Sequence, residues 1–161
     1  MIGAASTGDG KTYIHLCVAD LYLAGVTVVV VPTNALRVSV AEACAKVGIP
    51  FKECLPGCVG FENPHKWPVI DPTRVVIVVA DTATSSQSKF PQFLHVMGLR
   101  GLVNRVVVDE AQLVLEAADY RPGLKDLGKL GSMAGGRSRD VLEWLLYEEH
   151  DWRAWQGVAT R

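Results

Sequence analysis

The sequence predicts an α/β fold with a mainly parallel sheet, and two observations support that fold class. Near-continuous runs of Val and Ile, which are typical of strands covered on both faces, occupy Val26–Val31, Arg74–Ala80 and Val103–Asp109. Segments with helical spacing separate these runs, and alternation of strands with helices is the pattern of a parallel sheet. The 161 residues, 49% of them apolar, suit one domain with a filled core.

The predicted helices are defined by apolar periodicity and by the residues that stop them. Lys11–Leu23 is followed by Gly25, and Ala35–Val47 is followed by Gly48. Glycine is the usual residue just past the end of a helix. A third helix is expected from about Pro91 to Leu99. This order of elements agrees with a sheet that helices cover on both faces.

The remaining segments have other patterns. Phe51–Cys54 is expected to form a short strand, and Leu55–Pro72, rich in proline and glycine, a surface loop. Gly131–Gly136 has a flexible composition, and Arg139–Trp155 has the spacing of an amphipathic helix. The apolar face of that helix would consist of Val141, Leu142, Leu145 and Leu146, and its tryptophans are Trp144, Trp152 and Trp155.

Composition excludes several classes of function. Sixteen basic and seventeen acidic residues leave a formal net charge of −1, so no global positive field attracts a polyanion, and any nucleic-acid contact must be local. The longest uncharged apolar run, Val26–Leu36, is too short to span a bilayer. Met1–Ala4 does not resemble the start of a secretory signal. We therefore expect an intracellular protein with free thiols and no membrane partner.

The strongest chemical signal is a glycine-rich segment immediately before the first predicted helix. Gly8 and Gly10 would let the backbone curl so that successive N–H groups point at phosphate oxygens. Lys11 would reach the β- and γ-phosphates of a nucleotide, and the Thr12 hydroxyl would hold Mg²⁺. The predicted ATP-binding residues are Ala5, Ser6, Thr7, Gly8, Asp9, Gly10, Lys11 and Thr12.

A second signal is the pair of carboxylates at the end of the last Val-rich run. Asp109 and Glu110 follow Val106–Val108 and would lie at the carboxyl edge of the sheet, where ligands bind in open α/β folds. Asp109 would hold Mg²⁺, and Glu110 would orient or deprotonate the attacking water. The two signals together predict a nucleotide site.

These segments resemble the motifs of superfamily 2 helicases. With Asp119–Pro122 after the acidic pair, the order of segments is most similar to the RecQ-like DNA helicases of fungi. The matching segments are Ala5–Thr12 for motif I, Val28–Leu36 for motif Ia, Val75–Thr82 for motif Ib and Asp109–Gln112 for the DExx box of motif II.

The resemblance implies a three-layer RecA-like P-loop NTPase domain over residues 1–130, followed by a divergent helical tail over residues 131–161. It implies that Lys11, Asp109 and Glu110 act on ATP. It also implies that Gln112 couples the nucleotide to a partner lobe.

The resemblance further implies a nucleic-acid partner. In the family, the motif Ia loop touches the phosphate backbone of a single strand, expected here to be DNA. The residues expected at that contact are Pro32, Thr33 and Arg37. A nuclear location is expected from the family alone.

The sequence departs from the family pattern in three places. Met1–Ala4 stand where the family has a full strand, no Ser/Thr-Ala-Thr-like motif III follows Leu130, and no second RecA-like lobe follows. We therefore expect a domain incomplete at both ends, a fragment that binds Mg·ATP without unwinding on its own. Whether it hydrolyses ATP is left open by these residues.

Two other functions also stay open from the residues alone. A small P-loop kinase would use the same loop, with Arg137, Arg139 and Arg153 as candidate lid arginines. A non-catalytic interaction module would dock a protein partner through the tryptophan-rich helix, because Trp and Tyr are enriched at interface anchors. The candidate anchors are Trp144, Tyr147, Trp152 and Trp155.

Overall fold

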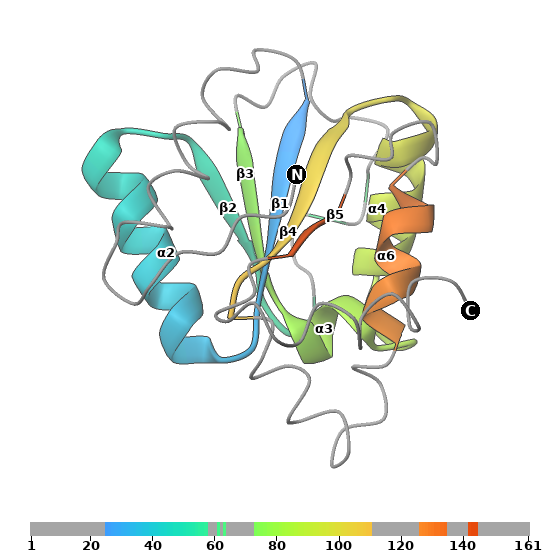
Figure 1. Ribbon diagram of the computed structural model, residues 1–161, viewed down its shortest axis with the longest axis horizontal. Helices are drawn as coiled ribbons and strands as arrows, with labels where there is room; N and C mark the ends of the chain where they lie inside the picture. The colour runs from blue at the N-terminus through green and yellow to red at the C-terminus, as the bar shows by residue number, and fades with distance from the viewer. Residues whose placement is uncertain are drawn as a thin grey trace.

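The fold is built on a parallel five-stranded sheet (Figure 1). The computed structural model describes residues 25–57, 61, 63, 73–110, 126–134 and 142–144, the last of these ranges by its backbone alone. The strands follow the order β2-β3-β1-β4-β5, and each neighbouring pair is parallel. They are β1 (Val26–Val31), β2 (Phe51–Cys54), β3 (Val75–Val79), β4 (Val103–Val108) and β5 (Leu142–Trp144).

Helices cover both faces of the sheet, so the described elements form three layers. One face carries α2, and the other carries α3, α4 and α6 (Figure 1). Alternate residues of β1 point to opposite faces, and the strand is buried along its whole length. This arrangement confirms the predicted α/β class. The helices are α2 (Asn34–Val47), α3 (Ala80–Thr84), α4 (Phe90–Leu99) and α6 (Leu127–Met133).

The predicted element bounds agree closely with those observed. The strand predictions at Val26–Val31 and Phe51–Cys54 are confirmed without change. Arg74 lies just outside β3, and Ala80 begins α3, because the chain enters a helix directly after β3. The predicted helix over residues 11–23 lies outside the described residues.

The bounds of α2 follow from its two capping residues. Thr33 precedes the helix in an extended conformation, and its Oγ1 accepts a hydrogen bond from the Leu36 N–H at 3.3 Å. Gly48 ends the helix with a φ of 76°, and its N–H donates to the carbonyl oxygens of Cys44 and Ala45. A left-handed conformation at this position favours glycine, as the sequence predicted.

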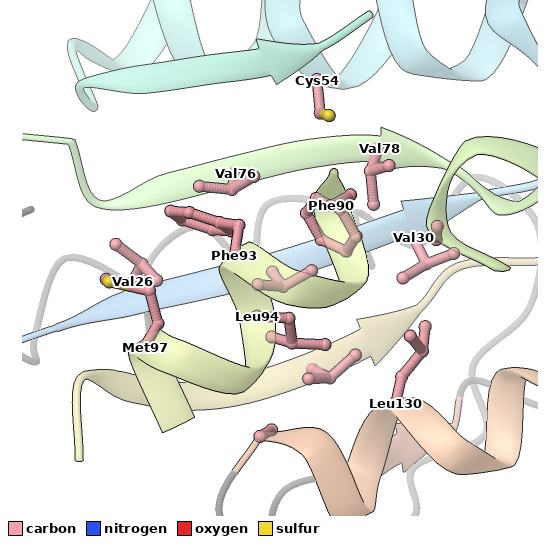
Figure 2. Close-up of a cluster of buried hydrophobic side chains, with 14 of the residues drawn as sticks. Val26, Val30, Cys54, Val76, Val78, Phe90, Phe93, Leu94, Met97 and Leu130 are labelled. Atoms are coloured by element: carbon pink, nitrogen blue, oxygen red, sulfur yellow. The ribbon is translucent and has the colours of Figure 1, made fainter. Parts of the chain in front are cut away.

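The larger of the two hydrophobic clusters lies between the sheet and α4. Phe93 of α4 lies beside Val76 of the sheet, Met97 lies beside Val26, and Leu94 belongs to the same cluster (Figure 2). Leu127 and Leu130 of α6 join the same cluster. A second cluster, on the opposite face, packs Val40 and Cys44 of α2 against Val29, Val31, Val75 and Ile77.

Phe61 corrects the interpretation of Leu55–Pro72 as a surface loop. Its side chain is only 2% exposed and belongs to the larger cluster, between the sheet and α4. The Phe61 ring meets the Phe93 ring edge-on, with centroids 4.9 Å apart, and the Phe90 ring at 6.4 Å. A single aromatic residue in a stretch without periodic apolar positions gives no recognisable pattern, so sequence reasoning missed that Phe61 is a core residue.

The carboxyl-terminal segment also differs from its prediction. Leu142–Trp144 forms β5 and pairs with Val106–Val108 of β4, so the predicted helix over Arg139–Trp155 is wrong at these residues. Pairing supplies partners for the backbone N–H and C=O groups of β4, and such tertiary interactions override helical spacing. Gly131–Met133, expected to be flexible, is the last turn of α6. Trp144 therefore stands in the sheet, and the other predicted tryptophan anchors lie outside the described residues.

A search of the described residues for a membrane span gave a negative result. None of their helices is both long and apolar enough to cross a bilayer.

Candidate functional site

Three chain segments meet at the carboxyl edge of the sheet. Val30 of β1 is in register with Val78 of β3 on one side and with Val108 of β4 on the other. Because the strands are parallel, the residues that follow them come out at the same edge. These residues are Pro32–Asn34 after β1, Ala80 and Asp81 after β3, and Asp109 and Glu110 after β4.

Asp109 is held to the central strand by its backbone. Its N–H donates to the Val30 carbonyl oxygen at 2.9 Å, which extends the β1–β4 pairing one residue beyond β4. Behind it, Val106–Val108 are fully buried. A side chain whose Cα is fixed in this way, on a packed strand, is well positioned to act on a ligand at the edge.

Glu110 turns the chain sharply away from the strand. Its φ of 51° lies in the left-handed region, which costs a residue with a Cβ about 1 kcal/mol. The Glu110 N–H donates to Oδ1 of Asp109 at 3.0 Å, and this local hydrogen bond offsets part of that cost. Both side chains are half-buried. Backbone strain next to two carboxylates is a feature that occurs often at functional sites.

The acidic pair has the chemistry of a magnesium site that is completed by a substrate. Magnesium prefers oxygen ligands and is usually bound through one or two carboxylates together with substrate phosphates. No cluster of three or more His, Cys, Asp or Glu side chains that could hold a metal is found among the described residues. The two carboxylates of Asp109 and Glu110 are the type of ligand that fits a Mg²⁺ ion arriving with substrate phosphates.

Several predicted site residues lie outside the part of the chain that the structure describes. They are Ala5, Ser6, Thr7, Gly8, Asp9, Gly10, Lys11, Thr12 and Gln112. Their roles in binding ATP and Mg²⁺ stay predictions.

The residues predicted to contact nucleic acid lie in three different environments. Pro32 is buried directly after β1, Thr33 is exposed and caps α2, and Arg37 is half-buried in the first turns of α2. The Arg37 side chain forms an ion pair through Nη1 with Oε2 of Glu53, and its Nε–H donates to Oδ1 of Asn34 at 3.3 Å. Their predicted contact with a phosphate backbone stays a prediction.

Sequence reasoning missed Asn34 and Glu53. No pattern in the sequence could have found Glu53, because it is the order of the strands in the sheet that brings the end of β2 to the same edge as the start of α2. Only the pairing of β2 with β3, which is tertiary information, puts the Glu53 carboxylate within reach of the arginine.

The family of the chain follows from a comparison with protein-family models. The model of the DEAD/DEAH box helicases matches residues 1–140, which include both the glycine-rich segment and the acidic pair. The chain belongs to the DEAD/DEAH box helicase family. No curated protein matched the chain.

Membership of the DEAD/DEAH box family confirms the coarse form of the predicted function. Domains of this family are the ATP-binding motors of nucleic-acid helicases. The acidic pair at the end of β4 is the segment that resembles the DExx box. The match favours a helicase motor over the small P-loop kinase that the glycine-rich segment alone left open.

Proposed function

We propose that this chain is the Mg·ATP-binding lobe of a RecQ-like DNA helicase and that it contacts single-stranded DNA at the start of α2. The family match over residues 1–140 carries the proposal, and the acidic pair is placed by the hydrogen bond from the Asp109 N–H to the Val30 carbonyl oxygen, 2.9 Å long. This bond joins the acidic pair to the strand whose next residues, Pro32 and Thr33, begin the segment predicted to contact the nucleic acid.

In this proposal each residue of the acidic pair has its own task. Asp109 binds the cation that accompanies ATP, and its position is set by the buried valines behind it and by its bond to β1. Glu110 orients the water that attacks the terminal phosphate. When bound, Mg²⁺ would neutralise charge on the phosphates, and hydrolysis of a phosphoanhydride depends mainly on such positioning and charge stabilisation.

The finer assignment to a RecQ-like DNA helicase is supported by the sequence alone. Its support is the order of the motif-like segments together with Asp119–Pro122. Equilibrium binding of matched oligodeoxynucleotides and oligoribonucleotides tests it, because a DNA motor should bind the DNA strand at least as tightly as the RNA. Preference for RNA would reject the RecQ-like assignment and leave the family assignment intact.

Titration calorimetry with Mg·ATP tests the nucleotide site. We expect saturable binding to the unmodified chain and a loss of about tenfold or more in affinity, equal to ~1.4 kcal/mol, in Lys11→Ala and in Asp109→Asn. Glu42→Gln is the control, because Glu42 is exposed on α2 and its replacement removes the same charge away from the carboxylate pair. A folded chain that does not bind Mg·ATP, or an Asp109→Asn variant that binds like the control, would contradict the proposal.

A further inference from the structure

The start of α2 carries an arginine whose charge is already neutralised by the protein. Arg37 Nη1 pairs with Glu53 Oε2, and Glu53 comes from β2, sixteen residues further along the chain. The side chains are 15% and 28% exposed, so the pair is part-buried and keeps limited contact with solvent. Asn34 accepts the Nε–H of the same guanidinium, which fixes its orientation.

The surroundings of Arg37 would otherwise favour an anion. The first turn of α2 contains no acidic residue, and a helix of fourteen residues presents positive partial charge at its N-terminus. The Arg37 backbone N–H donates to the Thr33 carbonyl at 3.1 Å, so the residue is fixed next to the exposed cap. Among the described residues paired with Arg37, Glu53 is the one that opposes binding of a phosphate. Its carboxylate already pairs with Nη1 of Arg37, and its negative charge repels a phosphate.

We propose that Glu53 restrains nucleic-acid binding by holding Arg37 in an autoinhibitory ion pair that an incoming phosphate must displace or share. This inference rests on the proposed contact between the start of α2 and single-stranded DNA. It assigns to β2, through Glu53, a role in setting the affinity and the salt dependence of that contact.

Other contacts hold α2 to the sheet without this ion pair. Val40, Ala41 and Cys44 of α2 are buried against the sheet in the second hydrophobic cluster. The ion pair is part-buried, so exchange of its partner costs more than exchange in a fully exposed pair, and these buried contacts are what keep the helix in place meanwhile. The Arg37–Glu53 pair can therefore exchange partners without unfolding the helix, as a regulatory contact requires.

The size of the expected effect follows from Coulomb's law. Release of the Arg37 charge, ~6 Å from a bound phosphate in an environment close to that of water, raises affinity by about threefold at low ionic strength. The released arginine also neutralises one more phosphate. For a single strand this steepens the plot of log K against log salt concentration by about 0.7.

Fluorescence anisotropy of a labelled oligo-dT, titrated with the full chain, tests the proposal. Glu53→Gln should bind about threefold more tightly and show the steeper salt dependence, since the amide keeps the size of the side chain and loses its charge. Glu42→Gln is the matched control, because it removes a charge from an exposed position on α2 itself. Glu53→Thr, whose branched side chain suits a strand, is a second charge-removing variant should Glu53→Gln not fold.

The double variant separates regulation from a general change in net charge. In the Arg37→Ala background, Glu53→Gln should give no steeper salt dependence and little gain in affinity. Unchanged or weaker binding by Glu53→Gln, or the same gain without Arg37, would overturn the inference while leaving the proposed DNA contact in place. If the unmodified chain does not bind the oligonucleotide at all, both the contact and its restraint are wrong.

Discussion

Replacement of Phe61 by alanine tests whether the segment between β2 and β3 is part of the hydrophobic core. The ring is 2% exposed and stands edge-on to Phe93, with centroids 4.9 Å apart. Truncation of a buried phenylalanine costs about 3–5 kcal/mol, a value that already includes the cost of the cavity left in the core. We expect a loss of this size in the free energy of unfolding.

The assay is thermal and urea unfolding of Phe61→Ala beside Asn63→Ala. For a chain of this length each kcal/mol lowers Tm by roughly 2–4 °C, so the Phe61 variant should melt about 10 °C below the unmodified chain. Asn63 is an exposed residue of the same segment, and its variant should melt close to the unmodified chain. A loss below about 1 kcal/mol in Phe61→Ala would refute the core assignment, because a surface position typically costs no more than that.

Three further outcomes follow from single buried positions. Gly25→Ala should destabilise the fold by about 1–3 kcal/mol in urea unfolding, because Gly25 has a φ of 90° and an added Cβ would lie 2.6 Å from the Leu102 carbonyl oxygen. Thr27→Val should stabilise it by about 1 kcal/mol in the same assay; Thr27 is 1% exposed, and no partner for its hydroxyl is found among the described residues. Burial raises the pKa of the Cys44 thiol from 9.0 to about 11, which disfavours the reactive thiolate, so alkylation followed by peptide mapping should modify Cys44 far more slowly than a free thiol. Equal stability in either substitution, or rapid labelling of Cys44 in the folded chain, would contradict these assignments.

The acidic pair shows how far sequence reasoning reached. The position of Asp109 at the end of a buried strand could be predicted, because a run of valines that ends in a carboxylate is typical of the carboxyl edge of a parallel sheet. The left-handed conformation of Glu110 and the bond from Asp109 to Val30 could not. The bond to Val30 depends on how β4 is aligned against β1, which involves residues far apart in the sequence.

The carboxyl-terminal segment shows where periodicity misleads. Leu142–Trp144 lies in a stretch with helical spacing, and it nevertheless forms a strand. A three-residue strand carries too little pattern to be recognised, and its conformation depends on its partner β4. The ion pair between Arg37 and Glu53 could not be predicted either, because it too depends on a partner distant in the sequence.

The sequence by itself determined the α/β class, most element bounds and the family to which the chain belongs. These depend on local signals: buried valine runs, helix caps such as Thr33 and Gly48, and a glycine-rich segment of fixed spacing. Only the tertiary structure decided the strand order, the burial of Phe61 and the partner of Arg37. The physical reason is that strand pairing and core packing join residues distant in sequence, and no local pattern records which distant partner gives the lowest free energy.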